Sequence, residues 1–363
     1  MFAKAVFPGK YIQGAGALQE LPALLHSLGR KGLVLASPSV HGKVLPASGI
    51  DWRQEHVTQE VFGGECCEEE LSRVLAVIRE RHVDVLVGMG GGKTIDAAKI
   101  AADRAGIPVV VVPTIASTDA PCSGCAVLYS RDGVFERVFY QKANPSAVLV
   151  DTSVIVSAPV RFLVAGMGDA LATWFEARSC VQTRSANECG GLCTAVGLSI
   201  ARLCYETLLE HGPAARLACE RALNTPAVER IVEANILLSG IGFESAGLAA
   251  AHAVHNGLTA LPETHAFHHG EKVAFGVLTG LLLTGAPQAE IKAVYDFCRE
   301  VGLPTTLADI GLAKVDRRQL LTAARMACEP EQSMQHEAGT ITAERVLDAM
   351  LAADAMGQAM NRK

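Results

Sequence analysis

The sequence of 363 residues lacks three features that would each point to a particular class of protein. It has no dense run of basic residues, and its net charge is −6, which argues against binding to DNA or RNA. Residues 1–14 hold no apolar run of signal-peptide length. The most apolar segments, 107–114 and 273–285, fall short of the roughly 20 residues that span a bilayer. We therefore expect a cytoplasmic protein with no nucleic-acid or membrane partner.

Neither an internal repeat nor a low-complexity linker interrupts the sequence. Half of its residues are hydrophobic and 19% are charged, a balance typical of globular proteins with large cores. The length suits two domains better than one. The two expected domains are residues 1–158 and 159–363, and they differ in the pattern of their apolar residues.

Cysteine is abundant, with eleven residues, yet its distribution does not favour a disulfide scaffold. Such scaffolds are short secreted chains, whereas most cysteines here lie in apolar helical stretches. We interpret these thiols as small buried side chains in a reducing compartment. Cys122 and Cys125 have the C-x-x-C spacing of zinc ligands, but no second pair completes a structural zinc site.

The first expected domain alternates short β-branched runs with amphipathic stretches. Asp132 and Gly133, between two alternating segments, predict a hairpin over 125–140. Continuous apolar strands separated by helices indicate a parallel sheet that is covered on both faces. The strands are expected at 32–37, 83–90, 107–114 and 147–155, and the helices at 63–83 and 93–106.

The second expected domain shows almost no strand signal. Its apolar periodicity predicts helices at 161–180, 201–212, 229–258 and 343–363. We therefore expect an α/β domain followed by an all-α domain. The active site is expected in the cleft between them, because ligands commonly bind between domains.

A glycine-rich turn at 88–94, GMGGGKT, links an expected strand to an expected helix. The backbone N–H groups of such a turn, with a helix N-terminus behind them, suit a phosphate or pyrophosphate. Two standard motifs fit incompletely. Val87 stands where a P-loop needs glycine, and Lys93 stands where G-x-G-x-x-G needs its third glycine. Phosphate binding and a plain tight turn are both compatible with this pattern.

A second polar loop, PTIASTDAPCSG at 113–124, follows the next expected strand. Ligands bind at the carboxyl ends of the strands in open α/β sheets, so this loop is either part of a binding site or a polar connector. Its polar side chains are Thr114, Ser117, Thr118, Asp119 and Ser123.

Five histidines lie between residues 251 and 276 and raise the question of a metal site. They are His252, His255, His265, His268 and His269. His252 and His255 share one face of an expected helix, and His269 begins the next helix. Asp169 offers a third ligand, because an unpaired carboxylate in its apolar surroundings is costly, although a helix N-cap is its alternative role.

A metal with three protein ligands and an open position is catalytic rather than structural. Such a metal polarises a hydroxyl oxygen and lowers its pKa. Together with a phosphate-binding turn, it points to the dehydrogenation of an alcohol by a nicotinamide cofactor.

Long segments of the sequence resemble the bacterial glycerol dehydrogenases of the iron-containing (group III) alcohol dehydrogenase superfamily. The segments are GGGKTIDAAK, PTIASTDAPCS, RFLVAGMGDALATWFEAR, GFESAGLAAAHAVHNGLTA and HGEKVAFGVLT. The resemblance implies a Rossmann-like domain and an all-α domain in a dehydroquinate synthase-like architecture. It also implies oxidation of glycerol to dihydroxyacetone, NAD and Zn²⁺ as cofactors, and a homo-octamer.

Matching motifs assign the site residues that the resemblance implies. Zinc would be held by Asp169, His252 and His269, and Asp119 would face the substrate. His255 would lie near the substrate or nicotinamide, either as a proton relay or as a core histidine. The cofactor would lie along Ser37, Gly90, Gly91, Gly92, Lys93, Thr94, Asp96, Thr114, Ser117, Ser123, Cys125 and Tyr129.

Two positions depart from the pattern of the superfamily. Thr173 stands where iron-dependent members have a histidine as fourth ligand, which favours zinc. Ser37 stands where glycerol dehydrogenases usually have an aspartate that binds the ribose, so a preference for NAD over NADP is left open. We interpret His268 as a neighbour of the ligand His269, and His265 as a loop residue.

Other functions on the same residues are a related oxidoreductase of small diols or 2-oxoaldehydes, a glycerol-1-phosphate dehydrogenase-like enzyme and a dehydroquinate synthase-like lyase. A phosphorylated substrate needs lysine or arginine beside it, and the loops 116–124 and 260–269 carry none. The alternative that is not an enzyme is a non-catalytic metal-binding protein, but such a function does not explain the glycine turn.

Overall fold

The computed structural model describes residues 1–362, which form two compact units. The α/β unit holds Phe7–Val160 and Ala218–Gly240. The helical unit holds Met1–Val6, Arg161–Leu217 and the chain from Ile241 onward. These bounds differ from the expected ranges 1–158 and 159–363 in two places. The segment 218–240 belongs to the α/β unit, and the first six residues belong to the helical unit.

Hydrogen bonds explain why the segment 218–240 belongs to the α/β unit. The carboxylate of Glu229 accepts hydrogen bonds from Gln13 Nε2, at 2.8 Å, and from Thr152 Oγ1, at 2.6 Å. Asn235 Nδ2 donates to the carbonyl of Ala116 at 3.0 Å. These partners are distant in the sequence, so no local pattern predicts them.

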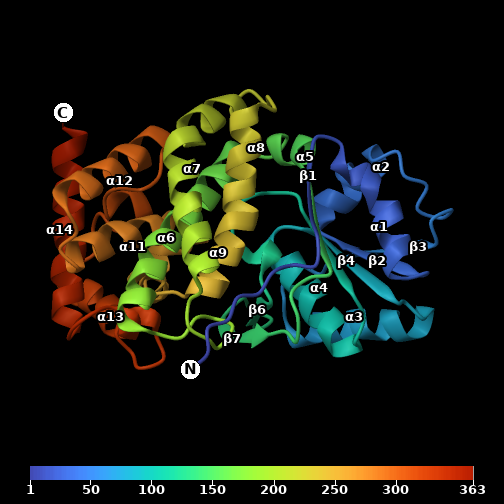
Figure 1. Ribbon diagram of the computed structural model, residues 1–363, viewed down its shortest axis with the longest axis horizontal. Coiled ribbons are helices and arrows are strands. Elements are labelled where there is room, and N and C mark those ends of the chain that lie inside the picture. The colour runs from blue at the N-terminus through green and yellow to red at the C-terminus, as the bar shows by residue number, and fades with distance from the viewer. Residues whose placement is uncertain (363) are drawn as a thin grey trace. The chain divides into compact units, whose positions relative to one another are not determined.

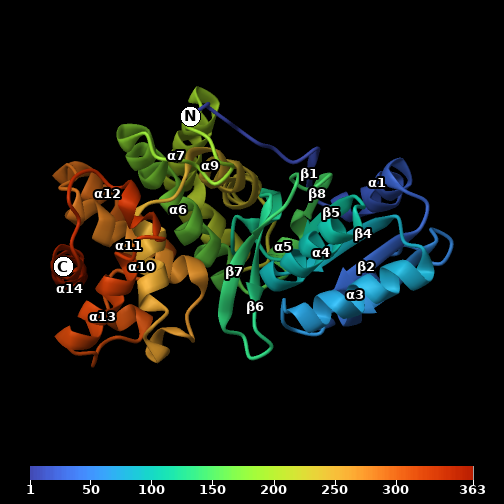
Figure 2. The same cartoon turned by 90° about the horizontal axis from the view of Figure 1, so that it is seen from below.

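The α/β unit is built on a parallel six-stranded sheet with the strand order β1-β8-β5-β4-β2-β3. This sheet and the helical second unit confirm the expected fold class. The strands are β1 (Tyr11–Gly14), β2 (Gly32–Ala36), β3 (Val57–Val61), β4 (Val85–Gly90), β5 (Val109–Pro113) and β8 (Ala147–Asp151). The expected hairpin is the antiparallel pair β6 (Cys125–Tyr129) and β7 (Phe135–Tyr140), visible in Figure 2.

Helices cover both faces of the sheet because alternate residues of a strand point to opposite sides. Val85, Val87 and Met89 of β4 pack into one core with the leucines of α1. On the other face, a Cβ added to Gly88 would lie 2.6 Å from the Cβ of Ala98, so the glycine lets α4 approach the strand closely. Figure 1 shows α1 (Leu21–Leu28) and α2 (Leu45–Ala47) on one side, and α3 (Glu68–Arg81) and α4 (Gly92–Ala105) on the other.

Two strands of this unit were missed in the sequence, and one was predicted too long. The missed strands β1 and β3 are only partly buried and have no continuous apolar run, which is the signal of a buried strand. The strand expected at 147–155 ends at Asp151, and helix α5 (Thr152–Val156) follows it. The Asp151 side chain stops the strand there, because it caps α5 by accepting the backbone N–H of Ser153 at 3.0 Å.

The helical unit is a bundle in which α10, α11, α13 and α14 lie side by side (Figure 2). The helices α6 to α8 are α6 (Val160–Thr183), α7 (Ala195–Cys219) and α8 (Pro226–Glu233), and α8 lies in the α/β unit. The remaining helices are α9 (Ser239–Ala246), α10 (Ala250–Leu258), α11 (His269–Leu283), α12 (Gln288–Val301), α13 (Arg317–Ala327) and α14 (Ala343–Asn361).

The single helix expected at 229–258 was wrong, because the chain breaks between α9 and α10. Gly247 has φ +108°, a conformation that favours glycine, and a Cβ there would lie 2.7 Å from Cys180 Sγ. The break lets α10 start in a new direction, and α10 carries His252 and His255.

Within residues 1–362, no helix by itself has both the length and the apolar composition of a membrane span. One sharply bent pair, Pro226–Ala246 with Ala250–Leu258, meets these two criteria when its helices are taken together.

Candidate active site

Asp169 lies in the middle of α6 and is 1% exposed. Its position inside the helix excludes the N-cap role that the sequence left open. Burial alone would raise the pKa of the Asp169 carboxyl. Attraction to His269 and hydrogen bonds with His252 and His269 outweigh burial and hold this pKa well below its ordinary value.

His252 and His269 face Asp169 from two other helices. The Nε2 atom of His252 is 3.5 Å from Asp169 Oδ1, and that of His269 is 3.0 Å from the same oxygen. One ligand atom from each of the three residues lies within 4.8 Å of the others. Among the described residues, this is the one group of histidine, cysteine and acidic side chains that is compact enough to hold a metal ion.

Two glycines allow α6 and α11 to meet beside these residues. A Cβ on Gly270 would lie 1.8 Å from the carbonyl oxygen of Ala165, and a Cβ on Gly168 would lie 2.3 Å from that of Gly270. The two backbones are therefore in direct contact. Because each glycine directly neighbours a site residue, this contact brings Asp169 and His269 together.

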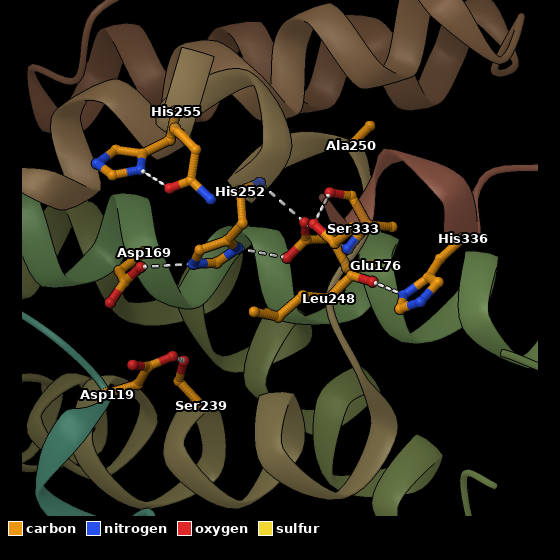
Figure 3. A network of polar contacts seen from close by, with 12 residues as sticks. Asp119, Asp169, Glu176, Ser239, Leu248, Ala250, His252, His255, Ser333 and His336 are labelled. Carbon is orange, nitrogen blue, oxygen red and sulfur yellow. Dashed lines mark hydrogen bonds and ion pairs between the residues drawn. The ribbon is translucent and has the colours of Figure 1, made fainter. Parts of the chain in front are cut away.

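Glu176 supports His252 from behind, and sequence reasoning missed it. Its Oε2 is 2.7 Å from His252 Nδ1, and its Oε1 accepts the backbone N–H groups of His252 and Ala249. Figure 3 shows the His252 ring between Asp169 and Glu176. The spacing of Glu176 from Asp169 could have revealed it in the sequence. Seven residues are about two helical turns, so both carboxylates lie on one face of α6.

The two carboxylates govern the charge of His252. Burial alone would lower the pKa of His252, but Glu176 and Asp169 outweigh it and raise this pKa well above its ordinary value. Without a metal, the imidazole lies between two carboxyl groups that favour its protonated form. A divalent cation would take the place of that proton, since metal ligands must be deprotonated.

The other histidines of the cluster do not belong to the group of three ligand candidates. His255 is buried, and its Nε2 is 3.0 Å from His269 Nδ1. Burial, together with the neighbouring His269 and Lys272, keeps the pKa of His255 well below its ordinary value. His268 directly precedes α11, and its N–H donates to Glu271 at 2.7 Å. His265 is exposed, and its Nε2 is 2.9 Å from the carbonyl oxygen of Thr259.

In the α/β unit, the glycine turn and the residues expected beside it lie at the carboxyl ends of the strands. Strand β4 ends at Gly90 and α4 begins at Gly92. A Cβ on Gly90 would lie 2.9 Å from Thr94 Oγ1 and 3.1 Å from Ser37 Cβ. The backbone N–H of Thr114 donates to Gly90 at 3.1 Å and joins the second loop to this turn.

Lys93 and Tyr129 are also brought together in this unit. The Lys93 ammonium lies 5.0 Å from the centre of the Tyr129 ring and forms an ion pair with Glu65. The carboxylate of Asp96 is buried and accepts the N–H of Val127 in β6 at 3.1 Å. Burial raises the pKa of Asp96 to about 6, although attraction to Lys99 opposes this shift.

The loop 114–125 is held in place from two sides. Ser239 Oγ donates to Asp119 Oδ2 at 3.2 Å (Figure 3). The buried Lys99 donates to the carbonyls of Ala120 and Cys125 and to Ser123 Oγ. The cofactor candidates Ser123 and Cys125 therefore have fixed positions, while Ser117 on the same loop is half-buried.

Cys122 and Cys125, like the other cysteines among the described residues, form no disulfide. Neither belongs to the group that is able to hold a metal. Lys99 and Ser123 account for the fixed loop without a structural zinc ion.

Comparison with known proteins agrees with this combination of fold and site. The sequence profile described as "Iron-containing alcohol dehydrogenase" matches residues 8–152. The chain is 50% identical to the glycerol dehydrogenase of Thermotoga maritima, over 99% of this chain and 98% of the relative. It is 42% identical to a glycolaldehyde reductase of Halobacterium salinarum, over 97% of each chain.

A solved structure is also similar to this chain over almost the full length of both. It is a probable glycerol dehydrogenase from Sinorhizobium meliloti, with a TM-score of 0.92, 47% identity, and coverage of 98% of this chain and 99% of that one. The present chain belongs to the iron-containing alcohol dehydrogenase family of oxidoreductases. Within this family, its full-length similarity lies with the glycerol dehydrogenases, which confirms the resemblance seen in the sequence.

Proposed function

We propose that this protein oxidises glycerol at C2 to dihydroxyacetone and transfers the hydride to NAD, with Zn²⁺ held by Asp169, His252 and His269. The observation that carries the proposal is the convergence of these three side chains in a chain that resembles glycerol dehydrogenases over its full length. The octamer implied by the resemblance and the cytoplasmic location expected from the sequence stay predictions.

The donor set fits a divalent metal. One carboxylate and two imidazoles are ligands that zinc accepts, and three protein ligands leave a position open for substrate. Each imidazole has its Nδ1 bonded to another side chain and its Nε2 directed at Asp169. When bound, the zinc ion supplies Lewis-acid chemistry, which polarises an alcohol oxygen and eases the loss of its proton.

The remaining roles in the proposal belong to residues of this chain. Asp169, buried and ionised, contributes the negative charge that attracts a cation. Glu176 and His255 orient the two imidazoles. Asp119, fixed by Ser239, accepts a hydrogen bond from a glycerol hydroxyl and orients the substrate.

NAD is proposed to lie along the carboxyl ends of β2, β4 and β5. The turn Gly90–Gly92 and the N-terminus of α4 offer N–H groups to its phosphates, and Lys93 offers a positive charge. Ser37 lies beside Gly90, where an adenosine ribose is expected. The loop 114–125 and Tyr129 flank the same edge of the sheet.

Zinc is proposed over iron because Thr173 occupies the position of the fourth ligand of iron-dependent relatives. Thr173 is buried one helical turn after Asp169, and it offers a hydroxyl group where those relatives have an imidazole. Restoring the metal-free enzyme separately with zinc and with iron tests this choice. Recovery of full activity with iron alone would refute it.

The function is tested by NADH formation with glycerol, 1,2-propanediol and glycerol-1-phosphate, measured before and after treatment with a chelator. We expect turnover of glycerol and the diol, loss of both on chelation, and little turnover of the phosphate. The reverse assay, with glycolaldehyde and NADH, examines the second candidate function, which the 42% identity to a glycolaldehyde reductase favours. Turnover that is indifferent to the chelator would refute the metal mechanism.

A further inference from the structure

A series of side-chain hydrogen bonds leads away from His269 on the side opposite Asp169. His269 Nδ1 is 3.0 Å from His255 Nε2, and His255 Nδ1 is 2.9 Å from Asn256 Oδ1. Asn256 Nδ2 then donates to Gln332 Oε1 at 2.8 Å. The four residues form one continuous path, which we call the His255 relay.

The His255 relay has one direction of donation. Because the amide nitrogen of Asn256 donates to Gln332, its oxygen faces His255, and this oxygen can only accept. His255 Nδ1 therefore carries a proton. In a neutral imidazole the other nitrogen is then an acceptor, so His255 Nε2 accepts the N–H of His269 Nδ1.

This direction determines which nitrogen of His269 is left for a metal. A metal ion would displace the proton that His269 Nε2 shares with Asp169 Oδ1 at 3.0 Å. Because the other proton of the ring is held on Nδ1, the lone pair left for the metal is then on Nε2. If His255 presented a donor instead, His269 would have to place its proton on Nε2, where a proton excludes a metal ion. The acceptor that sets this choice is the Asn256 oxygen, two residues along the relay.

We propose that Asn256 is a positioning residue that, through His255, fixes the proton of His269 on Nδ1 and presents its Nε2 to the metal. The inference rests on the proposed metal function of Asp169, His252 and His269. It gives the two imidazole ligands different supports: the anion Glu176 stands behind His252, and a series of neutral groups stands behind His269.

Zinc affinity of two Asn256 variants tests the proposal. Asn256→Leu removes the acceptor at similar size, while Asn256→Asp keeps an acceptor beside His255 Nδ1. We expect zinc to bind Asn256→Leu roughly 10–100-fold more weakly than wild type, and Asn256→Asp to stay close to wild type. The affinity is measured by competition with a chromophoric chelator, and the thermal unfolding midpoint is measured on the metal-free proteins.

The matched control is Asn224→Leu, which removes an amide that donates to Thr152 and Glu229 in the α/β unit. It should keep the zinc affinity of the wild type. If Asn256→Leu does not fold, Gln332→Met replaces it. That variant releases the far end of the relay and should weaken zinc binding by a smaller factor.

The outcomes separate this inference from the proposed function. A wild-type protein that binds no zinc refutes the metal site itself. A wild type that binds zinc while Asn256→Leu binds it equally well refutes the positioning role. Equal losses in the Leu and Asp variants, with equally lowered unfolding midpoints, would assign Asn256 a structural role and also overturn the proposal.

Discussion

Two buried aspartates, one in each unit, lie on helices and have opposite electrostatic surroundings. Asp169 on α6 faces two imidazoles, which hold the pKa of its carboxyl well below the ordinary value. Asp96 on α4 is 6% exposed, and burial raises its pKa to about 6. The burial of a carboxylate therefore does not by itself mark a ligand, and the groups that face it decide its role.

The same contrast extends to the hydrogen bonds of the two carboxylates. Asp96 Oδ2 accepts the N–H of Val127, while its Oδ1 has no hydrogen-bond partner among residues 1–362. A buried oxygen without a partner disfavours the ionised form. Asp96 is thus expected to hold β6 against α4, and Asp169 to attract a cation.

The largest effect is expected for Asp169→Asn. The substitution removes the negative charge between His252 and His269 and leaves the size of the side chain nearly unchanged. We expect the loss of metal to exceed the roughly 10–100-fold weakening typical of residues behind metal ligands, and glycerol oxidation to fall with it. Metal content and NADH formation measure this, with Asp96→Asn as the matched control for metal content. An Asp169→Asn enzyme that kept both would contradict the ligand assignment.

Asp96 is expected to make the unfolding free energy depend on pH. Its pKa is about 6 when folded and about 3.9 when unfolded, so the folded state binds its proton more tightly. The resulting stabilisation is full below pH 4 and is lost as the pH rises through 6, a change of roughly 2–3 kcal/mol. The difference in unfolding free energy between Asp96→Asn and wild type should therefore shift in favour of the variant when the pH is raised from 4.5 to 7.5. Unfolding in urea at both values checks this, and a constant difference would contradict it.

Glu176→Gln probes the support of His252. Glutamine removes the negative charge and has one acceptor oxygen where the carboxylate has two. Either His252 Nδ1 or the backbone N–H groups of Ala249 and His252 therefore lose their acceptor. We expect zinc affinity to fall roughly 10–100-fold, with the metal-free protein still folded. Glu337→Gln is the control, because this buried carboxylate accepts hydrogen bonds from Ser179 and Ala250 and touches no ligand candidate. Equal affinities in the two variants would show that the charge behind His252 does not matter.

The smallest effect is expected at Ser37, which lies beside the glycine turn of the α/β unit. An aspartate there would accept a hydrogen bond from the ribose of NAD and repel the 2′-phosphate of NADP. Ser37→Asp should therefore raise the ratio of kcat/KM for NAD to that for NADP by roughly tenfold, the value of about one hydrogen bond. An unchanged ratio would remove Ser37 from the cofactor site.

Much of the fold follows from the sequence, because β2, β4, β5 and the hairpin have local apolar or turn signals. The edge strands β1 and β3 and the placement of residues 218–240 do not follow, since they depend on partners distant in the chain. The cluster of Asp169, His252 and His269 was proposed from motifs, and the structure brings these residues together. Glu176 and the His255 relay required three-dimensional distances, because no spacing reveals which side chain stands behind an imidazole.

The most direct test of the central claim is X-ray absorption at the zinc edge of the zinc-loaded protein. Ligation by Asp169, His252 and His269 predicts a first shell of nitrogen and oxygen only, at about 2.0–2.2 Å, with imidazole scattering that disappears in Asp169→Asn. A sulfur shell at about 2.3 Å would place the metal on cysteines such as Cys122 and Cys125, and it would contradict the account.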